Sequence, residues 1–138
     1  MTRAPEIYAR WLKLWNGDDS EIRTLIAPDF EGSWPGRPKM VRGQAALLEV
    51  IRQSHAFFTE LHFRLEVGPV AQENLLAARW TSRGRYAGGM PGATAPAGLE
   101  VTFGGMDLLR LEGGRIREYW VNSDALELMT QLGVVRPG

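Results

Sequence analysis

The sequence predicts one α+β domain in which helices pack on one face of a curved antiparallel sheet. Apolar residues recur at helical spacing in the first sixty residues, whereas from Leu61 the pattern changes to extended segments separated by turn residues. Helices first and strands later are typical of α+β domains. The 138 residues are enough for one sizeable core, so we expect a single domain over residues 1–138.

Two helices are predicted before the first strand. The first carries an apolar row at helical spacing, formed by Ile7, Trp11, Leu14 and Trp15. Asn16 and Gly17 end this helix. A short second helix begins at a capping box of Asp18 with Glu21, and Pro28 stops it. The stretch "DFEGSW" then predicts a short strand.

Two more helices are expected later in the chain. A longer one follows Gly43, and its broad apolar stripe runs as far as Phe58. The last is short: Ser123 or Asp124 caps it, it runs through Leu132, and Gly133 closes it. Between them the sequence predicts four strands, at roughly residues 61 to 70, 74 to 86, 99 to 111 and 114 to 121.

Composition narrows the class of partner. Sixteen basic residues balance sixteen acidic ones with no long run of one sign, so the charge pattern of a nucleic-acid binder is missing. No cysteine occurs, which excludes disulfides, thiolate metal sites and thiol nucleophiles. No stretch approaches the roughly 20 apolar residues of a membrane span, and the N-terminus lacks a signal-like apolar core. We therefore expect a cytoplasmic protein whose partners are small molecules or other proteins.

The stretch "FGGMDLLRLEGGRIREYW", residues 103 to 120, predicts a hairpin with a carboxylate, Asp107, in an apolar row. The turn is either Glu112-Gly113 or Gly113-Gly114. Side chains alternate along each strand, so both turns predict the same core-facing set: Val101, Phe103, Asp107, Leu109, Leu111, Ile116, Glu118 and Trp120. Tyr119 falls on the opposite side, together with Met106, Leu108 and Arg110.

A carboxylate that faces an apolar interior has a raised pKa, and such an acid can exchange a proton near neutral pH. Asp107 is therefore the first candidate catalytic residue. The alternative is structural, because Asp107 can also pair with a neighbouring arginine or accept backbone hydrogen bonds. Glu118 is a second candidate, although it lies near a strand end where it can reach solvent.

Several segments together resemble the SnoaL-like polyketide cyclase family of the nuclear-transport-factor-2-like superfamily. They are "LWNGDD", "IAPDF", "RGRYAGGMPG" and above all "LLRLEGGRIREYW" followed by "SDALELMTQLG". The resemblance covers nearly the whole chain. It implies a cone-shaped fold, in which helices close an apolar pocket on the concave face of a strongly curved sheet, and it implies a homodimer built on that sheet.

The resemblance also bears on chemistry. In polyketide cyclases of this family an aspartate is the acid/base and a histidine on the preceding strand assists, with no metal or organic cofactor. Those positions fall on Val121 and Asp107 respectively, and neither residue is kept. Because valine cannot transfer a proton, the resemblance implies the pocket for a small hydrophobic molecule more than it implies the cyclisation.

Two further residues are candidates for proton transfer. His55 lies in a helical row with Leu48, Ile51 and Phe58, and it is either a core or rim histidine or a proton-transfer partner of Asp107. Asp124 is either a helix cap or a second catalytic acid. The histidines and carboxylates show no metal-ligand spacing, so we expect no metal site and no cofactor.

The expected pocket wall is aromatic. Flat rings can stack on a planar ligand, and we place three tryptophans there: Trp15, Trp34 and Trp120. The other predicted substrate-binding residues are Phe58, Met90, Phe103 and Val121. The Gly- and Pro-rich segment Met90 to Gly98 is either a lid over the pocket or a plain hairpin loop.

Three functions remain open. The first is an acid/base enzyme in which Asp107, with His55 or Glu118, isomerises, cyclises or dehydrates a carbonyl-bearing hydrophobic substrate. The second is a non-catalytic protein that binds a small hydrophobic ligand. The third is an epoxide hydrolase-like enzyme, which needs two carboxylates around a water; Asp107 and Glu118 are the pair predicted to face the same way.

Overall fold

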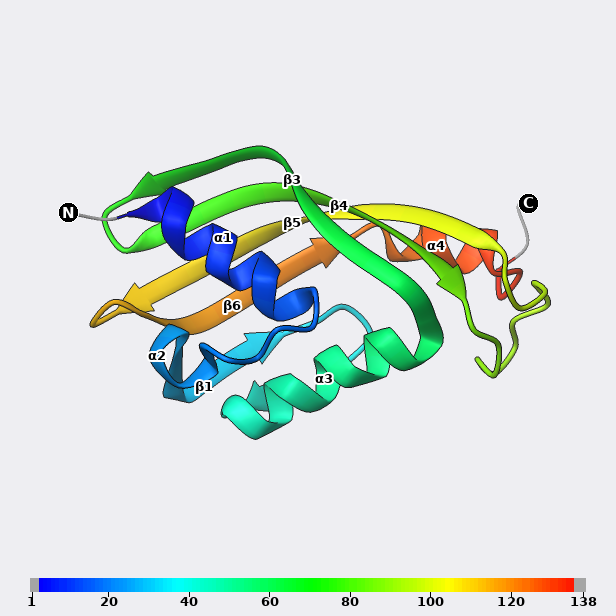
Figure 1. Cartoon of the computed structure of the whole chain (residues 1–138), viewed down its shortest axis with the longest axis horizontal. Coiled ribbons are helices and arrows are strands. Elements are labelled where there is room, and N and C mark those ends of the chain that lie inside the picture. The colour runs from blue at the N-terminus through cyan, green and yellow to red at the C-terminus, as the bar shows by residue number, and fades with distance from the viewer. Residues whose placement is uncertain (1–2, 136–138) are drawn as a thin grey trace.

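The computed structural model describes residues 3–135, and these form a mixed sheet with the helices of the N-terminal half on one face (Figure 1). The strand order is β2-β1-β6-β5-β4-β3. β1 runs parallel to β6, and the other neighbouring pairs are antiparallel. The strands are β1 (Ile26–Ser33), β2 (Val41–Arg42), β3 (Phe58–Gln72), β4 (Leu75–Tyr86), β5 (Glu100–Glu112) and β6 (Arg115–Ser123). The predicted α+β class and the curved sheet are confirmed.

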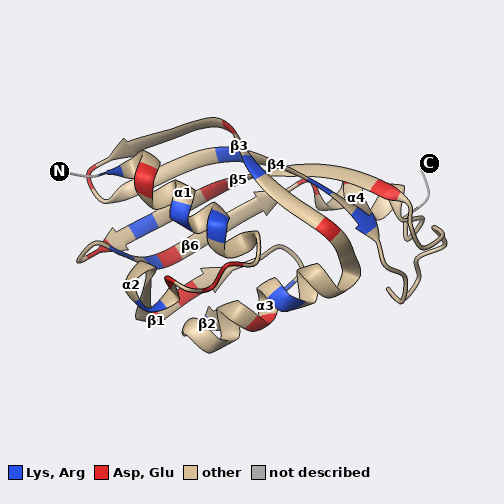
Figure 2. Ribbon diagram, viewed as in Figure 1, with Lys and Arg blue, Asp and Glu red and all other residues tan. Residues whose placement is uncertain are grey.

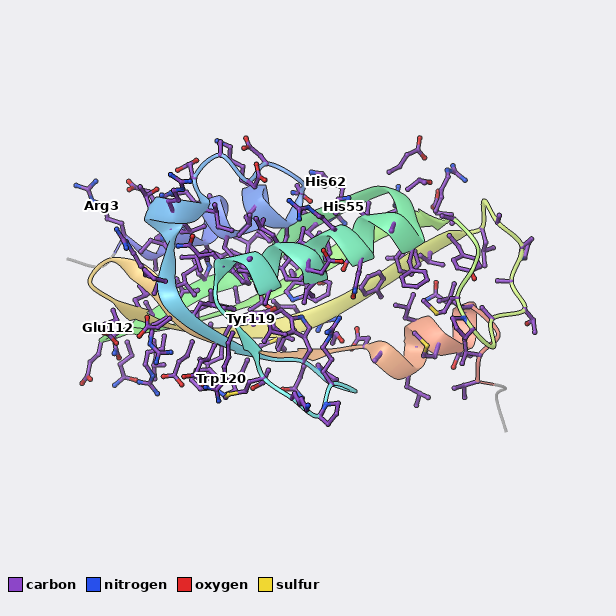
Figure 3. All side chains as sticks on the ribbon, turned by 90° about the horizontal axis from the view of Figure 1, so that it is seen from below. Arg3, His55, His62, Glu112, Tyr119 and Trp120 are labelled. Carbon is purple, nitrogen blue, oxygen red and sulfur yellow. The ribbon has the colours of Figure 1, made fainter. Side chains whose placement is uncertain are left out.

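Within the described range, four helices accompany the sheet: α1 (Ala4–Trp15), α2 (Ile22–Leu25), α3 (Gln44–Phe57) and α4 (Ala125–Gln131). Pro5 lies in the first turn of α1, where its missing N–H costs no hydrogen bond. The predicted apolar face of α1 is buried, with Tyr8, Trp11, Leu14 and Trp15 turned inward. α1 and α3 both contact β3 from the same face of the sheet, and α4 packs against β5 (Figures 1 and 3).

The long strands alternate between a buried and an exposed face. Along β4 the even-numbered residues from Leu76 to Tyr86 are buried, and on β5 Val101, Leu109 and Leu111 face the same way. Met106 and Leu108 of β5 point to the opposite, exposed face. This period of two matches the sequence pattern, so the face of β5 that carries Asp107 is the one predicted.

The last hairpin differs from the prediction in one strand. Its turn is Gly113-Gly114, both with positive φ, since Glu112 pairs with Arg115. The next pairs are Leu111 with Ile116 and Arg110 with Glu118, so that one extra residue, Arg117, bulges from β6.

The bulge moves every later residue of β6 to the other face. The predicted orientation of Glu118 and Trp120 toward the helices is therefore wrong, and so is the outward orientation of Tyr119. Tyr119 is buried on the helix side, whereas Trp120 lies on the far side of the sheet (Figure 3). Val121, directly opposite Asp107, shares the helix side.

The third helix ends one residue earlier than predicted. Phe58 has an extended backbone and pairs with Tyr86, so it begins β3 instead of closing α3. Pairing with β4 thus decides this boundary.

Figure 2 shows Lys and Arg residues interspersed with Asp and Glu residues along the ribbon. Within residues 3–135, no helix is long and apolar enough to cross a membrane.

Candidate functional site

A cavity of about 290 Å³ lies between α1, α3 and the inner face of the sheet. Its wall is mainly aromatic, and the rings come from Trp11, Trp15, Trp34, Phe57, Phe58, Phe63, Trp80, Phe103 and Tyr119. Successive rings contact each other: Trp11 is 4.7 Å from Tyr119 and Phe63 is 5.3 Å from Trp80, measured between ring centroids. Such a wall suits a small molecule with a flat, apolar body.

Asp107 lies at this wall and is almost completely buried, with 3% of its surface exposed. Four side-chain donors surround its carboxyl group. Oδ1 accepts from the Tyr119 hydroxyl at 2.5 Å and from the Trp80 indole at 2.9 Å. Oδ2 accepts from the Tyr8 hydroxyl at 2.8 Å and from the Trp11 indole at 3.3 Å. The structural alternative predicted an arginine or backbone partner; instead, these four bonds come from aromatic side chains.

Three elements supply these donors. Tyr8 and Trp11 are three residues apart on α1 and so share the helix face that packs on the sheet. Trp80 comes from β4, where its neighbour Ala78 pairs with Asp107. Tyr119 comes from β6 and reaches Asp107 only because the bulge at Arg117 turns it inward.

Gly105 makes room for one of these donors. It precedes Asp107 by two residues on the same face of β5, and it pairs with Trp80. A Cβ atom at this position would lie 2.6 Å from a ring carbon of Trp80. The missing side chain therefore lets the indole lie across β5 and donate to the carboxylate.

Burial raises the pKa of the Asp107 carboxyl above its ordinary value, and the four hydrogen bonds oppose this shift because they stabilise the charged form. Burial and the neighbouring carboxylate also raise the pKa of the Tyr8 and Tyr119 hydroxyls. Both tyrosines thus stay protonated while Asp107 titrates. The site holds an acid that ionises less readily than a surface aspartate.

The other predicted catalytic residues lie apart from the cavity wall. The His55 imidazole is 2.7 Å from the backbone oxygen of Trp15, an interaction that anchors α3 to α1. Glu118 accepts from Arg110 at 2.8 Å on the outer face of the sheet. Asp124 occupies the N-cap position of α4 but makes no capping hydrogen bond, and its carboxylate is 3.5 Å from Arg79.

The predicted substrate-binding residues divide into two groups. Five line the cavity: Trp15, Trp34, Phe58, Phe103 and Val121. The other two lie elsewhere. Trp120 is on the outer face, where the Arg110 guanidinium is 5.7 Å from its ring centroid. Met90 packs at the edge of the core, and its backbone N–H donates to the Tyr86 hydroxyl.

Sequence reasoning missed four residues of the site. Tyr119 lies on the face opposite to the predicted one, because a bulge leaves no reliable mark in an alternating pattern. Tyr8, Trp11 and Trp80 are apolar-row or strand residues, and nothing local shows that their polar atoms converge on Asp107. The signal that was available is the number of Trp and Tyr residues, since these rings need a hydrogen-bond partner when buried.

The described residues hold no group of three or more His, Asp or Glu side chains that could bind a metal ion. The charged residues at the cavity wall, within the part of the chain that the structure describes, are Asp107 and Arg37, and the other polar lining groups are neutral.

Comparison with known proteins agrees with this architecture. The family described as SnoaL-like polyketide cyclase matches residues 6–132. TsrD from Streptomyces laurentii is 26% identical, with a TM-score of 0.81 over 98% of this chain and 99% of its own. IdmH from Streptomyces antibioticus is 27% identical, with a TM-score of 0.83 over 96% of this chain and 99% of its own.

A SnoaL-like polyketide cyclase from Agrobacterium tumefaciens shares the fold at 24% identity and a TM-score of 0.76, covering 96% of this chain and 100% of its own. No curated protein sequence matches this chain.

The raised pKa of Asp107 predicts a pH-dependent stability. The folded protein keeps this proton to higher pH than the unfolded chain, whose aspartate titrates near 3.8, so stability falls as pH rises from there through the folded-state pKa. Asp107→Asn removes this titration but leaves one indole N–H facing an NH₂ group, which lowers the free energy of unfolding by about 1–3 kcal/mol. Urea unfolding from about pH 4 to about pH 8 should show that the wild-type protein loses its greater stability over the Asp107→Asn variant as the pH rises. An advantage that grows with pH would contradict the raised pKa.

Gly105→Ala should lower the free energy of unfolding by about 1–3 kcal/mol, because the added methyl group displaces the Trp80 ring from Asp107. Thr102→Ala, on the exposed face of the same strand, is the matched control and should change stability little. Urea unfolding of both variants measures the difference. Equal stability of the two variants would show that Trp80 does not depend on the space at Gly105.

Proposed function

The chain belongs to the SnoaL-like polyketide cyclase family, and we propose that it is a cofactor-independent acid/base enzyme acting on a carbonyl-bearing hydrophobic molecule. One observation carries this proposal: a buried carboxyl group with a raised pKa, Asp107, is joined by a 2.5 Å hydrogen bond to Tyr119, and both residues line the aromatic cavity. The reaction is isomerisation, cyclisation or dehydration, each of which needs proton transfer beside a carbonyl group.

The hydrogen-bond inventory supports a role for Tyr119 as the group that meets the substrate. The indoles of Trp11 and Trp80 can only donate, and each occupies one oxygen of Asp107. A hydroxyl group can donate or accept. When Asp107 is protonated, it can therefore donate to Tyr119 without losing a hydrogen bond, and the Tyr119 hydrogen becomes free to point into the cavity.

Proton transfer then follows in both directions. With Asp107 ionised, the Tyr119 oxygen takes a proton from the carbon next to a carbonyl group while its own proton passes to Oδ1, and the C–H electrons form the enolate. With Asp107 protonated, the same steps run in reverse and return the proton to the substrate. The aromatic wall excludes water and orients the flat substrate.

A second function is favoured by the same contacts. The four donors satisfy the Asp107 carboxylate without any ligand. In this second function the carboxylate has a purely structural role, which is to fix α1 on the sheet. The protein is then a non-catalytic binder of a small hydrophobic ligand. The epoxide hydrolase-like alternative loses its basis, because Glu118 and Asp107 lie on opposite faces of the sheet.

Hydrogen exchange tests the proposal without knowledge of the natural substrate. The probe is 2-tetralone, a planar cyclic ketone, whose hydrogens next to the carbonyl exchange with D₂O and are followed by NMR. The wild-type protein should accelerate this exchange. Tyr119→Phe and Asp107→Asn should each reduce the acceleration by about 10²–10⁴-fold, the usual contribution of acid/base catalysis.

Tyr8→Phe is the matched control, because Tyr8 binds the same carboxylate but does not line the cavity. It should keep most of the acceleration. Bound 2-tetralone that exchanges no faster than in buffer would favour the non-catalytic binder. Equal losses in Tyr8→Phe and Tyr119→Phe would assign the network a structural role only.

The cytoplasmic location stays a prediction. We also propose that the chain forms a homodimer through the outer face of its sheet. Val67 and Met106 are 62% and 48% exposed there and lie in one row across β3, β4 and β5. Val70, Leu108 and Trp120 lie in the next row. Light scattering on a sizing column should give twice the 15.4 kDa chain mass.

The double variant Met106→Lys with Leu108→Lys should shift this mass to that of a monomer, because it places charge in the centre of the apolar face. Glu127→Lys, an exposed residue on α4, is the control and should leave the mass unchanged. A wild-type protein of monomer mass would disprove the dimer.

A further inference from the structure

Of the described residues that line the cavity, two carry a charge, and they differ in depth. Asp107 is almost fully buried, whereas Arg37 is exposed to solvent. The cavity thus has an acid in its interior and a cation at its entrance. The acid belongs to the proton-transfer site, and the cation has no role in that chemistry.

A tight turn places Arg37 at the entrance. The turn runs from Trp34 through Pro35 and Gly36, and the Arg37 N–H donates to the Trp34 oxygen at 3.2 Å. Gly36, at the third position of the turn, has φ +81°, a conformation that is strained for a residue with a side chain. Pro35 is at the second position, where proline is preferred. A turn of this kind keeps its first and last residues within about 7 Å. Trp34 and Arg37 therefore reach the cavity together.

Arg37 and Gln53 form a set of hydrogen-bond donors at the entrance. The guanidinium donates to the Gln53 side-chain oxygen at 2.8 Å, and both residues line the cavity. Since arginine can only donate, Gln53 must present its oxygen to Arg37, which leaves the amide NH₂ for another acceptor. Arg79, Arg85 and Arg110 each have a carboxylate partner, whereas no acidic side chain within residues 3–135 pairs with Arg37.

Trp34 links this entrance to the proton-transfer site. Its ring centroid is 5.1 Å from that of Tyr119 and 6.1 Å from that of Trp15. Gly32 gives the ring its place, because a Cβ atom there would lie 2.4 Å from a Trp34 ring carbon. One aromatic surface thus runs from Arg37 past Trp34 to Tyr119.

We propose that Arg37, with Gln53, binds an anionic oxygen group of the substrate, such as a carboxylate, while the apolar body lies along Trp34. Guanidinium groups bind planar oxyanions through paired, charge-assisted hydrogen bonds. The substrate is then an amphipathic molecule with an apolar body and an acidic end at the cavity entrance. That its carbonyl end meets Tyr119 rests on the proposed function; the anion site itself does not.

Two fluorescent probes that differ by one anionic group test this inference. They are 8-anilino-1-naphthalenesulfonate and N-phenyl-1-naphthylamine, which is the same molecule without the sulfonate. Arg37→Gln should raise the dissociation constant of the sulfonate about tenfold or more, which corresponds to the loss of one charge-assisted hydrogen bond. The dissociation constant of the neutral probe should change less than about twofold.

Three further measurements identify the cause. Arg37→Lys keeps the charge and should restore part of the sulfonate affinity. Arg52→Gln removes an exposed arginine from the same helix as Gln53, outside the cavity wall, and should change neither probe. Added NaCl should weaken sulfonate binding to the wild-type protein and have little effect on Arg37→Gln.

Equal losses for both probes, or no loss for either, would overturn the anion site. These titrations need no turnover, so their outcome is independent of hydrogen exchange by Asp107 and Tyr119. A negative result here leaves the proton-transfer proposal standing, and a failure of hydrogen exchange leaves this binding site standing.

Discussion

A buried carboxyl group is the constraint around which the fold is arranged. Asp107 lies on the inner face of β5, where a charge without partners would cost several kcal/mol. Two indoles and two phenols meet this cost, and they come from α1, β4 and β6. The same hydrogen bonds therefore hold the helix layer against the sheet and set the geometry of the cavity wall.

This arrangement connects stability with chemistry. Burial favours the neutral acid, and the four donors favour the carboxylate, so the two effects oppose each other at one group. Burial is the larger effect, so the net result is a raised pKa and a carboxyl group that keeps its proton to higher pH than a surface aspartate. Because Tyr8 and Tyr119 can reverse their hydrogen bonds whereas Trp11 and Trp80 cannot, the two tyrosines are where an added proton can be accommodated.

Small residues control where the aromatic rings go. Gly105 lets Trp80 lie across β5, and Gly32 lets Trp34 fold back over β1. The turn that follows Trp34 then brings Arg37 to the entrance. The polar ends of the cavity are thus positioned by backbone features, while the rings between them supply the apolar surface on which a flat ligand can lie.

Local sequence patterns determined a good part of this protein. Helical spacing predicted the buried face of α1, and alternation predicted that Asp107 faces the helices, because both signals depend only on residues close in the chain. The resemblance in "LLRLEGGRIREYW" predicted the family and the cone-shaped sheet. Of the three tryptophans that were placed at a pocket for their flat rings, Trp15 and Trp34 line the cavity, whereas Trp120 lies on the outer face of the sheet.

Tertiary structure decided the chemistry of the site. Because of the bulge at Arg117, Tyr119 lies on the inner face of the sheet, and Glu118 and Trp120 lie on the outer face. The bulge depends on how β6 pairs with β5 and not on a local pattern. Tyr8 is 99 residues away from Asp107 in sequence, so only the docking of α1 on the sheet brings its hydroxyl to the carboxyl group. The sequence by itself determined that an acid would be buried at Asp107; the packing of distant elements decided which groups share its proton, because hydrogen bonds form between atoms that the whole fold brings within about 3 Å.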